Sequence, residues 1–386
     1  MRKRINRNAR LEEKMKKYEE QIVMQGEGER GGFYWPSIAR LDDGRLIAGC
    51  SGFRVKHICP FGEVAIAFSS DDGKSWTEPK SVLNTPLDDR DAGVVDYDGK
   101  IIVTTFNNTR AFQLYEIAIK GQDITEEQKW AFIKRINEVS YEDERKYLGS
   151  LMFYSEDGGK TFSQPKKLPI TAPHGMIKLR DGRLFYVGRY FCDALPCKRD
   201  HHEGVAIITS TDGVIFTEPQ ELPLPDIAKE PDYLFCEPHA VQLNSGRIII
   251  GLRLQNYKKK VFTVYTCYSD DGGKTFTMPK PVTVNGKEVS GSPPHLIQHS
   301  SGAVVMVYGR RENPCGERAI VSYDDGMTWK GELVLNEEPN PNMGDIGYPA
   351  TVELKTGELY TVYYTHRNTN STINAVKWNI EDMEDL

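Results

Sequence analysis

The sequence predicts an all-β protein, a six-bladed β-propeller with a helical insertion in its second blade. Three features of the 386 residues lead to this fold. A turn motif recurs five times, a strand-turn-strand pattern recurs six times, and one long interval has helical rather than strand periodicity. A repeat of this size, made of short strands and turns, is typical of propeller blades.

The turn motif has the pattern Ser-x-Asp-x-Gly-x-x-aromatic, with one residue fewer in the third copy. The Ser and Asp side chains can bind nearby backbone amides, and the Gly can adopt a positive φ. We therefore expect each copy to form a hairpin between two strands, and we assign its aspartate a structural role. The five copies are separated by 86, 55, 59 and 53 residues and begin at Ser69, Ser155, Ser210, Ser269 and Ser322.

The second pattern is an apolar strand, a turn with Gly, and another apolar strand. Six such units and five hairpins give six blades of four strands. The missing sixth hairpin is explained if both ends of the chain close the last blade, with residues 21–24 beside residues 373–378, because closure also removes exposed strand edges. Clear copies of the pattern begin at Ile38, Met176, Val241 and Val352, and weaker copies begin at Val94 and Leu296.

The long interval contains residues 111–147, which are rich in Glu and Lys, include three Ala, and place apolar residues at helical spacing. We expect a helical insertion from blade two that serves either as a lid over the site or as a homo-oligomer contact. Residues 21–386, with this insertion, are predicted to form one propeller domain. Residues 1–20 are predicted to form a basic helical extension.

The bulk properties limit the partners. A formal net charge of -6 argues against nucleic acid. The basic amino terminus has no apolar run behind it, so we expect neither a secretory signal nor a membrane anchor, and a cytoplasmic location. The seven cysteines include no CxxC pair, which favours reduced thiols without zinc. We expect no cofactor and no metal ion.

Residues that flank each strand-turn-strand unit lie near the central axis of a propeller, so they are candidates for a shared site. Arginines at such places would together bind a carboxylate or phosphate group, because guanidinium groups bind these anions through two parallel hydrogen bonds. The alternative is that single arginines bridge neighbouring blades through backbone carbonyls. The candidate arginines are Arg54, Arg189, Arg253 and Arg310.

Three histidines occupy equivalent positions in blades three, four and five, at His174, His239 and His295. We place them among the substrate-binding residues. Three imidazoles near one axis are also able to bind a metal ion, although hydrogen-bonded histidines are the commoner case. They are equally candidates for the acid and base of a lyase or isomerase that acts on a uronic acid.

The hairpin motif is an Asp-box, and over residues 33–378 the chain resembles the sialidase superfamily of propellers. Enzymes of that family pair a tyrosine nucleophile with a glutamate, bind the substrate carboxylate with three arginines, and use an aspartate as the acid/base. The resemblance implies that Tyr348, in a Gly-Tyr-Pro segment, is the nucleophile. It implies that Glu237 is the base that activates this tyrosine.

The family's arginines are matched in part. Arg253 is similar to the second arginine, Arg310 to the third, and Arg54 to an additional arginine of the first blade. The family's first arginine is absent, because Tyr34 and Trp35 precede the proline of the first blade where that arginine is found. We take these two aromatic residues as substrate-binding candidates in its place.

The family's acid/base aspartate is also absent, since the segment between Arg54 and Glu63 contains no aspartate. Three candidates remain for protonating the leaving oxygen, namely His57, Asp91 and Glu63. We favour Asp91, at the start of blade two.

These features lead to one main hypothesis and two alternatives. The main hypothesis is an exo-acting glycoside hydrolase for an acidic mono- or oligosaccharide, containing sialic acid or a relative, that retains the anomeric configuration through Tyr348. The alternatives are a lyase that acts on uronate-containing oligosaccharides and a non-catalytic glycan-binding propeller.

Overall fold

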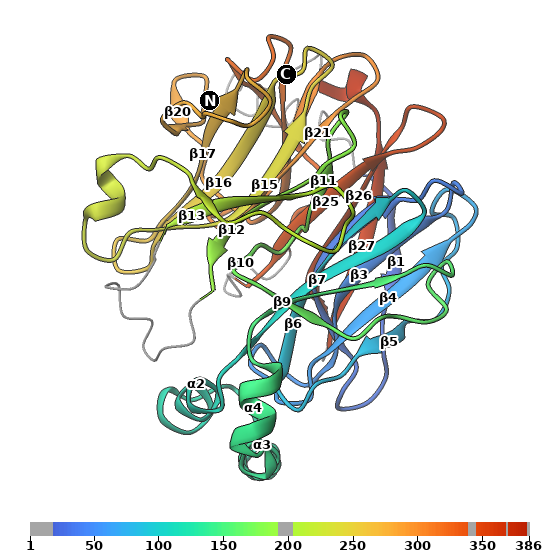
Figure 1. Ribbon diagram of the computed structural model, residues 1–386, viewed down its shortest axis with the longest axis vertical. Helices are drawn as coiled ribbons and strands as arrows, with labels where there is room; N and C mark the ends of the chain where they lie inside the picture. The colour runs from blue at the N-terminus through green and yellow to red at the C-terminus, as the bar shows by residue number, and fades with distance from the viewer. Residues whose placement is uncertain (1–17, 192–203, 339–344, 368–369, 384–386) are drawn as a thin grey trace, which may run out of the picture.

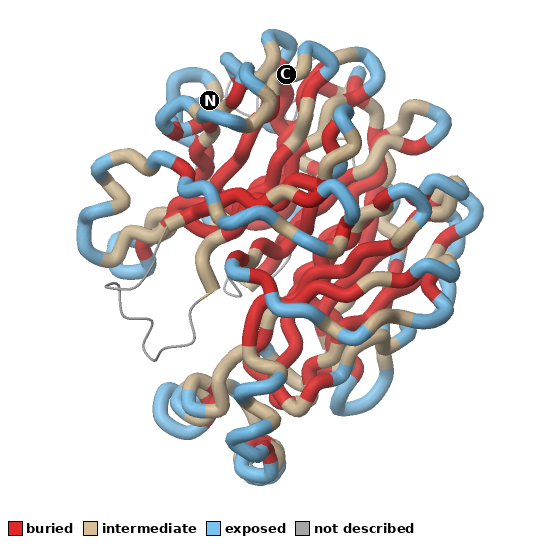
Figure 2. Tube along the Cα trace, in the orientation of Figure 1, coloured by how far each residue is buried: buried red, intermediate tan, exposed pale blue. Residues whose placement is uncertain are grey.

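The computed structural model describes residues 18–191, 204–338, 345–367 and 370–383. The predicted helical extension therefore lies outside the described residues, apart from residues 18–20. The fold is the predicted one: six antiparallel sheets surround one axis, and all but the last are built from strands that are consecutive in the sequence (Figure 1). Buried residues run along the strands of the sheets, and exposed residues gather in the turns (Figure 2).

The first three blades follow one another along the chain. Their strands, from the axis outward, are β2 (Gly32–Arg40), β3 (Leu46–Arg54), β4 (Glu63–Ser69) and β5 (Lys80–Leu83) in blade one, β6 (Asp88–Tyr97), β7 (Lys100–Asn108), β8 (Ser150–Ser155) and β9 (Lys166–Leu168) in blade two, and β10 (Ile170–Thr171) with β11 (Ile177–Lys178), β12 (Leu184–Tyr190), β13 (Val205–Ser210) and β14 (Gln220–Glu221) in blade three. The inner strand of blade three is divided, because β10 and β11 both pair with β12.

The last three blades complete the ring, and a small hairpin lies between blades four and five. Their strands are β15 (Leu234–Gln242), β16 (Ile248–Asn256), β17 (Val261–Ser269) and β18 (Lys280–Pro281) in blade four, β19 (Thr283–Val284) with β20 (Lys287–Glu288) in the hairpin, β21 (Pro294–Gln298), β22 (Val304–Arg310), β23 (Gly316–Ser322) and β24 (Lys330–Val334) in blade five, and β25 (Gly347–Glu353), β26 (Leu359–Arg367), β27 (Asn370–Trp378) and β1 (Glu20–Met24) in blade six. A short 3-10 helix, η2 (Asp226–Lys229), precedes β15.

The two ends of the chain close blade six, as predicted. Strand β1 pairs antiparallel with β27, with Glu20 opposite Val376 and Met24 opposite Ile373. In every other blade a hairpin connects the third strand to the fourth, whereas in blade six these two strands come from opposite ends of the chain. The sixth hairpin motif is absent for this reason.

Each of the five hairpins is held by its own Ser and Asp side chains. In the copy at Ser269, the Ser Oγ accepts a hydrogen bond of 2.9 Å from the backbone N–H of Gly273. The carboxylate of Asp271 accepts hydrogen bonds from both the backbone N–H and the hydroxyl of Thr275, which lower the pKa of this carboxyl. These aspartates stabilise turns at the blade edge, away from the axis, so their structural role is confirmed.

The hairpin glycines also connect neighbouring blades. Gly159 of blade two has a φ of +91°, and a Cβ atom on it would lie 2.4 Å from the ring of Phe68 in blade one. Gly73 of blade one lies against Tyr360 of blade six in the same way, and a Cβ atom on Gly73 would lie 2.6 Å from the Tyr360 ring. Each hairpin thus packs against the preceding blade, at a distance that leaves no room for a side chain.

Blade six has no such hairpin to pack against blade five, and the helix η3 (Ile380–Met383) takes its place. Ile380 and Met383 are buried in one apolar cluster with Leu333 and Leu335, which follow β23 in blade five. The Tyr18 hydroxyl donates a hydrogen bond of 2.9 Å to Asp382 of this helix. The joint between blades five and six is therefore made by both ends of the described chain.

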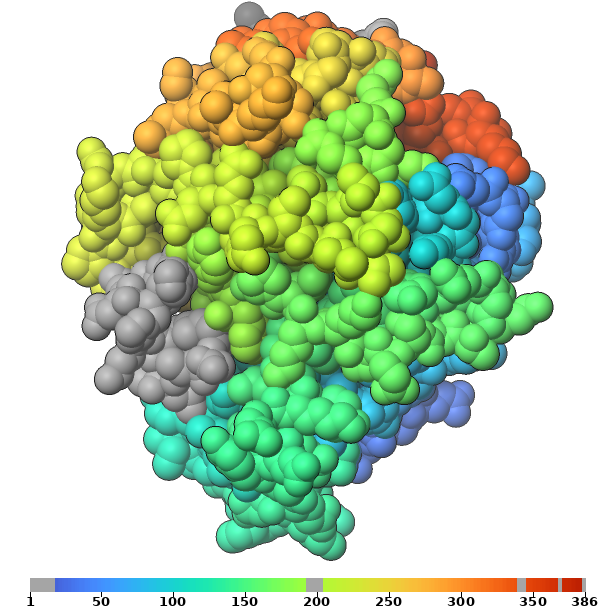
Figure 3. Space-filling view, viewed as in Figure 1, coloured from blue at the N-terminus to red at the C-terminus, as the bar shows by residue number. Residues whose placement is uncertain are grey.

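The helical insertion lies between β7 and β8 and projects from one end of the molecule (Figures 1 and 3). It begins one residue before the predicted bound and contains α2 (Arg110–Leu114), the π-helix η1 (Tyr115–Lys120), α3 (Glu126–Glu138) and α4 (Tyr141–Tyr147). Its buried residues Ile117, Phe132 and Ile136 pack on Ile58 and Cys59, in the loop that follows β3. None of the described helices is long and apolar enough to cross a membrane.

Deleting residues 1–24 should destabilise the propeller, because this removes β1 and leaves β27 as an unpaired edge. Burial of Val23 and Met24 alone contributes roughly 3–6 kcal/mol. Thermal unfolding should show a lower midpoint, and light scattering should show aggregation. Deletion of residues 1–17, which leaves β1 in place, is the control. Equal midpoints for the two deletions would contradict the proposed role of β1.

Candidate active site

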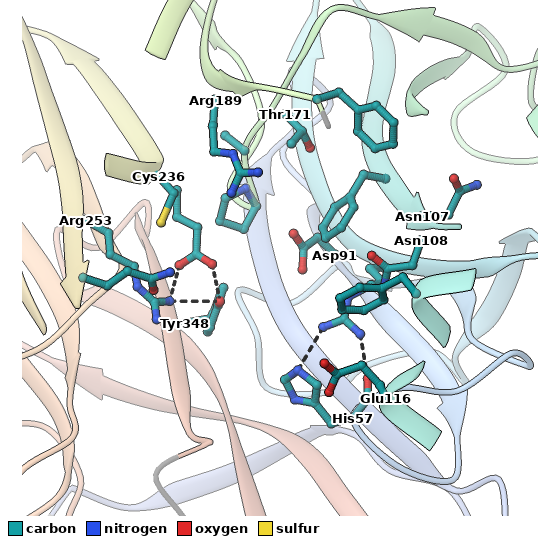
Figure 4. A pocket seen from close by; sticks show the side chains of 18 of the residues that line it. His57, Asp91, Asn107, Asn108, Glu116, Thr171, Arg189, Cys236, Arg253 and Tyr348 are labelled. Atoms are coloured by element: carbon teal, nitrogen blue, oxygen red, sulfur yellow. Dashed lines mark hydrogen bonds and ion pairs between the residues drawn. The ribbon is translucent and has the colours of Figure 1, made fainter. Parts of the chain in front are cut away.

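A cavity of about 680 Å³ lies where residues from all six blades and the insertion meet. Five of the predicted site residues line it: Asp91, Arg189, Glu237, Arg253 and Tyr348. Figure 4 shows Arg253 and Tyr348 on one side of the cavity and Asp91 facing them across it. Residues that are far apart in the sequence are thus brought together by the propeller.

Three of these residues lie at the same kind of backbone distortion. Asp91, Glu237 and Tyr348 have φ values of 57°, 46° and 51°, and each lies where the pairing of an inner strand shifts register. A bulge of this kind turns a side chain away from the alternation of the strand. A left-handed backbone at a residue other than glycine costs about 1–3 kcal/mol and is most often found at functional sites. Trp35, in β2, has the same distortion, with a φ of 52°.

Tyr348, Glu237 and Arg253 form one hydrogen-bonded group. The Tyr348 hydroxyl donates a hydrogen bond of 2.6 Å to Glu237 Oε1. Arg253 Nη1 donates to Glu237 Oε2 at 2.5 Å and to the Tyr348 oxygen at 3.3 Å. Burial raises the pKa of Tyr348 well above its ordinary value, and the charge of Glu237 raises it further. The resting phenol is therefore protonated, with a carboxylate placed to accept its proton.

Asp91 lies across the cavity and has a different environment. Its side chain has no hydrogen-bond partner among the residues that the structure describes, and the residue is only 7% exposed. Burial raises its pKa to about 7, while Arg90 opposes the rise and Glu237 adds to it. A carboxyl group with this pKa donates or accepts a proton readily near neutral pH.

The other two acid candidates, His57 and Glu63, already have hydrogen-bond or ion-pair partners within the protein. His57 lines the cavity, but its Nδ1 lies 2.8 Å from Asp345 and its Nε2 lies 3.2 Å from Arg90 Nη2. Because the guanidinium group only donates, Nε2 must accept and Nδ1–H must donate to Asp345, which leaves no free ring nitrogen. Glu63 pairs with Arg30 at 2.6 Å, outside the cavity. Asp91 is the acid candidate with its carboxyl group open to the cavity.

Two of the predicted arginines are corrected. Arg54 is completely buried and forms an ion pair of 2.7 Å with Asp88, so it holds the loop after β3 and does not line the cavity. Arg310 pairs with Glu332 at 3.1 Å and does not line the cavity either. Its neighbour Arg311 does, because successive residues at a strand end point to opposite sides.

The predicted aromatic pair is corrected as well. Trp35 and Tyr34 are buried and lie outside the cavity lining. The Trp35 ring lies against two guanidinium groups, 4.9 Å from that of Arg54 and 4.0 Å from that of Arg90. The Tyr34 ring packs against Tyr364. Both residues support the site from behind and have no surface for a substrate.

The three axial histidines lie close together but outside the cavity lining. His239 and His295 are stacked with ring centroids 4.1 Å apart, and His174 lies edge-on to both, at 5.8 and 5.1 Å. The Nδ1 atoms of His239 and His295 accept hydrogen bonds from the backbone N–H groups of Leu296 and Thr351. Burial lowers the pKa of all three residues, to about 3 for His174, so the imidazoles are neutral.

This tautomer argues against a metal site. With Nδ1 accepting, a neutral ring carries its proton on Nε2, which is then not available as a ligand. No group of three or more potential metal ligands is found among the described residues. The predicted substrate-binding role of His174, His239 and His295 is corrected to a structural one, since all three are at least 95% buried behind the cavity.

The charged residues that line the cavity include as many acids as arginines. The arginines are Arg90, Arg189, Arg253 and Arg311, and the acids are Asp91, Glu116, Glu237 and Asp345. The negative charge of the buried Asp88 is shared by two arginines, since it lies 2.7 Å from Arg54 and 3.4 Å from Arg90.

The sequence prediction missed Arg90, Arg311 and Asp345. Arg90 and Arg311 each lie next to a predicted residue, Asp91 and Arg310. The alternation of side chains along a strand is the signal that could have shown which residue of each pair faces the cavity. Asp345 lies outside the repeat pattern and had no such signal.

The His174→Phe variant should change the pH dependence of stability. The unfolded chain protonates this imidazole near pH 6.5, whereas the folded protein keeps it neutral to about pH 3, so acidification in this range favours unfolding. One histidine contributes about 1.4 kcal/mol per pH unit. Urea unfolding between pH 7 and 4 should show a shallower loss of stability in the variant. The control is His299→Gln, outside the axial cluster; parallel curves for wild type and His174→Phe would contradict the prediction.

Residues 62–361 match the family model of the BNR repeat-like domain. No curated protein resembles the chain closely enough in sequence to count as a match.

Solved structures share the fold at low sequence identity. A protein of unknown function from Dyadobacter fermentans is 20% identical with a TM-score of 0.69, over 94% of this chain and 98% of that one. The NanB sialidase from Streptococcus pneumoniae is 15% identical, with a TM-score of 0.63 over 95% and 71% of the two chains. An α-L-arabinanase from Penicillium chrysogenum is 11% identical, with a TM-score of 0.62 over 94% and 98%. The chain belongs to the BNR repeat-like family and has the propeller fold of the sialidase-like superfamily.

Proposed function

We propose that the chain is an exo-acting glycoside hydrolase that cleaves an acidic sugar, sialic acid or a relative, with retention of configuration. The observation that carries the proposal is the 2.6 Å hydrogen bond between Tyr348 and Glu237, held by Arg253 and facing Asp91. The similar structures include a sialidase and an α-L-arabinanase, which are enzymes that act on glycosidic bonds. A cavity of about 680 Å³ has the size of a small-ligand pocket, which suits one end of a glycan.

In the first step, the Tyr348 oxygen attacks the anomeric carbon while Glu237 takes the phenol proton. Asp91, protonated, gives its proton to the leaving oxygen as the glycosidic bond breaks. The products of this step are a covalent tyrosyl glycoside, a protonated Glu237, an ionised Asp91 and the free leaving group. The pKa of about 7 lets Asp91 hold this proton at neutral pH.

In the second step, ionised Asp91 takes a proton from a water molecule that attacks the same anomeric carbon. The bond to the Tyr348 oxygen breaks, and Glu237 returns the proton to the phenol. Two inversions give net retention, and both carboxyl groups are restored to their starting state.

A tyrosine nucleophile suits a substrate with a carboxylate on its anomeric carbon. An anionic carboxylate nucleophile would be repelled by that group, whereas a neutral phenol is not. Arg189, Arg253 and Arg311 line the cavity, and we assign them the substrate carboxylate. Tyr34 occupies the place of the arginine that sialidase-like sites have in the first blade, so the carboxylate is assigned to the arginines of blades three, four and five.

The test is release of free sugar from glycosides of nonulosonic and uronic acids. Tyr348→Phe should abolish release, because the nucleophile is lost while the ring remains. Asp91→Asn should lower kcat/KM on oligosaccharides by about 10²–10⁴-fold but retain most of kcat/KM on aryl glycosides whose leaving group needs no proton, because kcat/KM reports the first step. The pH profile of wild-type kcat/KM should fall above about pH 7, where Asp91 loses its proton, and this limb should be absent in Asp91→Asn.

Asp157→Ala, in a hairpin far from the cavity, is the control variant for general destabilisation. Full activity of Tyr348→Phe would overturn the assigned nucleophile. An unsaturated product with new ultraviolet absorbance would instead identify a lyase. Glycan binding with no release from any glycoside would identify a binding protein.

A further inference from the structure

The cavity has two parts that differ in exposure and chemistry. The inner part holds the reacting groups, with Asp91, Arg253 and Tyr348 exposed by 7%, 3% and 8%. The outer part is aromatic, and two of its tyrosines remain largely open to solvent, with Tyr115 exposed by 50% and Tyr257 by 68%. Exposed aromatic faces beside a polar cavity call for a ligand that covers them.

One wall of the outer part comes from the helical insertion. Phe112 of α2 and Tyr115 of η1 line the cavity. The insertion is fixed to the propeller, since the Gln122 side chain forms hydrogen bonds of 2.9 Å with both the N–H and the carbonyl of Ile58. Tyr115 therefore has a defined place at the cavity mouth. A π-helix such as η1 is itself most frequent at functional sites.

The opposite wall comes from blade four. Tyr257 follows β16, and its ring packs edge-on to Phe262 with the centroids 5.3 Å apart. Its hydroxyl accepts a hydrogen bond of 3.5 Å from Arg253 Nη2, the same guanidinium that holds Glu237 and Tyr348. This contact connects the outer wall to the inner, reacting part of the cavity.

The polar groups of the outer part are mainly uncharged. Asn108 and Gln255 line the cavity and offer neutral amides. Glu116, the charged residue that the insertion contributes to the lining, is paired with Lys120 at 3.0 Å. The arginines, by contrast, accompany the reacting groups. Neutral amides and aromatic faces suit the hydroxyl groups and apolar ring faces of an uncharged sugar.

We infer that the outer part is a leaving-group subsite, in which a neutral sugar lies against Tyr115 and Tyr257 while the acidic sugar occupies the inner part. This inference rests on the proposed function. It assigns the choice of leaving group to the insertion and to Tyr257, and the choice of cleaved sugar to the inner strands of the propeller.

The experiment compares two substrates that share the acidic sugar, sialyllactose and sialyl fluoride. The fluoride has no leaving sugar to contact the outer part. Tyr115→Ala should lower kcat/KM for sialyllactose by roughly tenfold, the loss expected for one stacking contact, and leave the fluoride within twofold of wild type. Tyr257→Ala should lower the value for sialyllactose more than the value for the fluoride, and some loss on the fluoride is expected because the variant also removes a hydrogen-bond partner of Arg253. Tyr141→Ala, 76% exposed elsewhere on the insertion, is the matched control and should change neither value.

Equal losses on both substrates, or no loss on either, would overturn the inference while leaving the hydrolase proposal intact. Binding of lactose to the intact protein, measured by calorimetry, gives a readout that needs no turnover. Lactose binding that is lost in Tyr115→Ala, in a protein that cleaves neither substrate, would support the neutral-sugar site and refute the hydrolase. Absence of both turnover and lactose binding would refute both.

Discussion

The site depends on the convergence of inner strands around one closed axis. The inner strands contact one another from β25 to β2, from β2 to β6, from β6 to β11, from β15 to β21 and from β21 to β25, and blade three contacts β15 through β12. In a regular strand, side chains would alternate between the cores on either side of a blade and none would point along the axis into the cavity. The bulges at Asp91, Glu237 and Tyr348 change this direction. Their conformational cost of about 1–3 kcal/mol each is offset by the tightly packed sheets around them.

The two carboxyl groups of the cavity owe their different chemistry to what surrounds them. Glu237 lies against a guanidinium and a phenol, so it is a charge-paired acceptor. Asp91 is buried with no such partner among the described residues, so burial shifts its pKa toward neutrality. Environments that separate two carboxyl groups in this way divide the roles of base and acid between them. Behind them, the Trp35 ring packs against the guanidinium group of Arg90. That guanidinium also donates a hydrogen bond to the Nε2 atom of His57.

The repeat made most of the fold predictable, because the position of each repeat in the sequence also gives the position of each strand and turn within it. It gave the five hairpins, the closure of blade six, and the arrival of Glu237 and Tyr348 at one place. The position of a repeat does not say which of two adjacent residues at a strand end points into the cavity. Arg310 was therefore predicted to line the cavity, whereas Arg311 does so. The prediction for Arg54 was wrong for another reason. An arginine near the axis can instead form an ion pair with a buried carboxylate, as Arg54 does with Asp88. The insertion has no repeat to set its phase, so its helices were predictable from periodicity but the place of Tyr115 at the cavity was not.

The closure of blade six also bears on how the chain is made. Strand β1 is synthesised before every other described strand, yet its partner β27 is the last of them. Throughout translation, β1 is therefore a strand with no edge to join, while blades one to five can assemble in order as each hairpin packs against the blade before it. The propeller ring, and with it the placement of Tyr348 opposite Asp91, is completed only when β27, the last of the described strands, has been made. A nascent or truncated chain would carry most of the fold and none of the assembled chemistry.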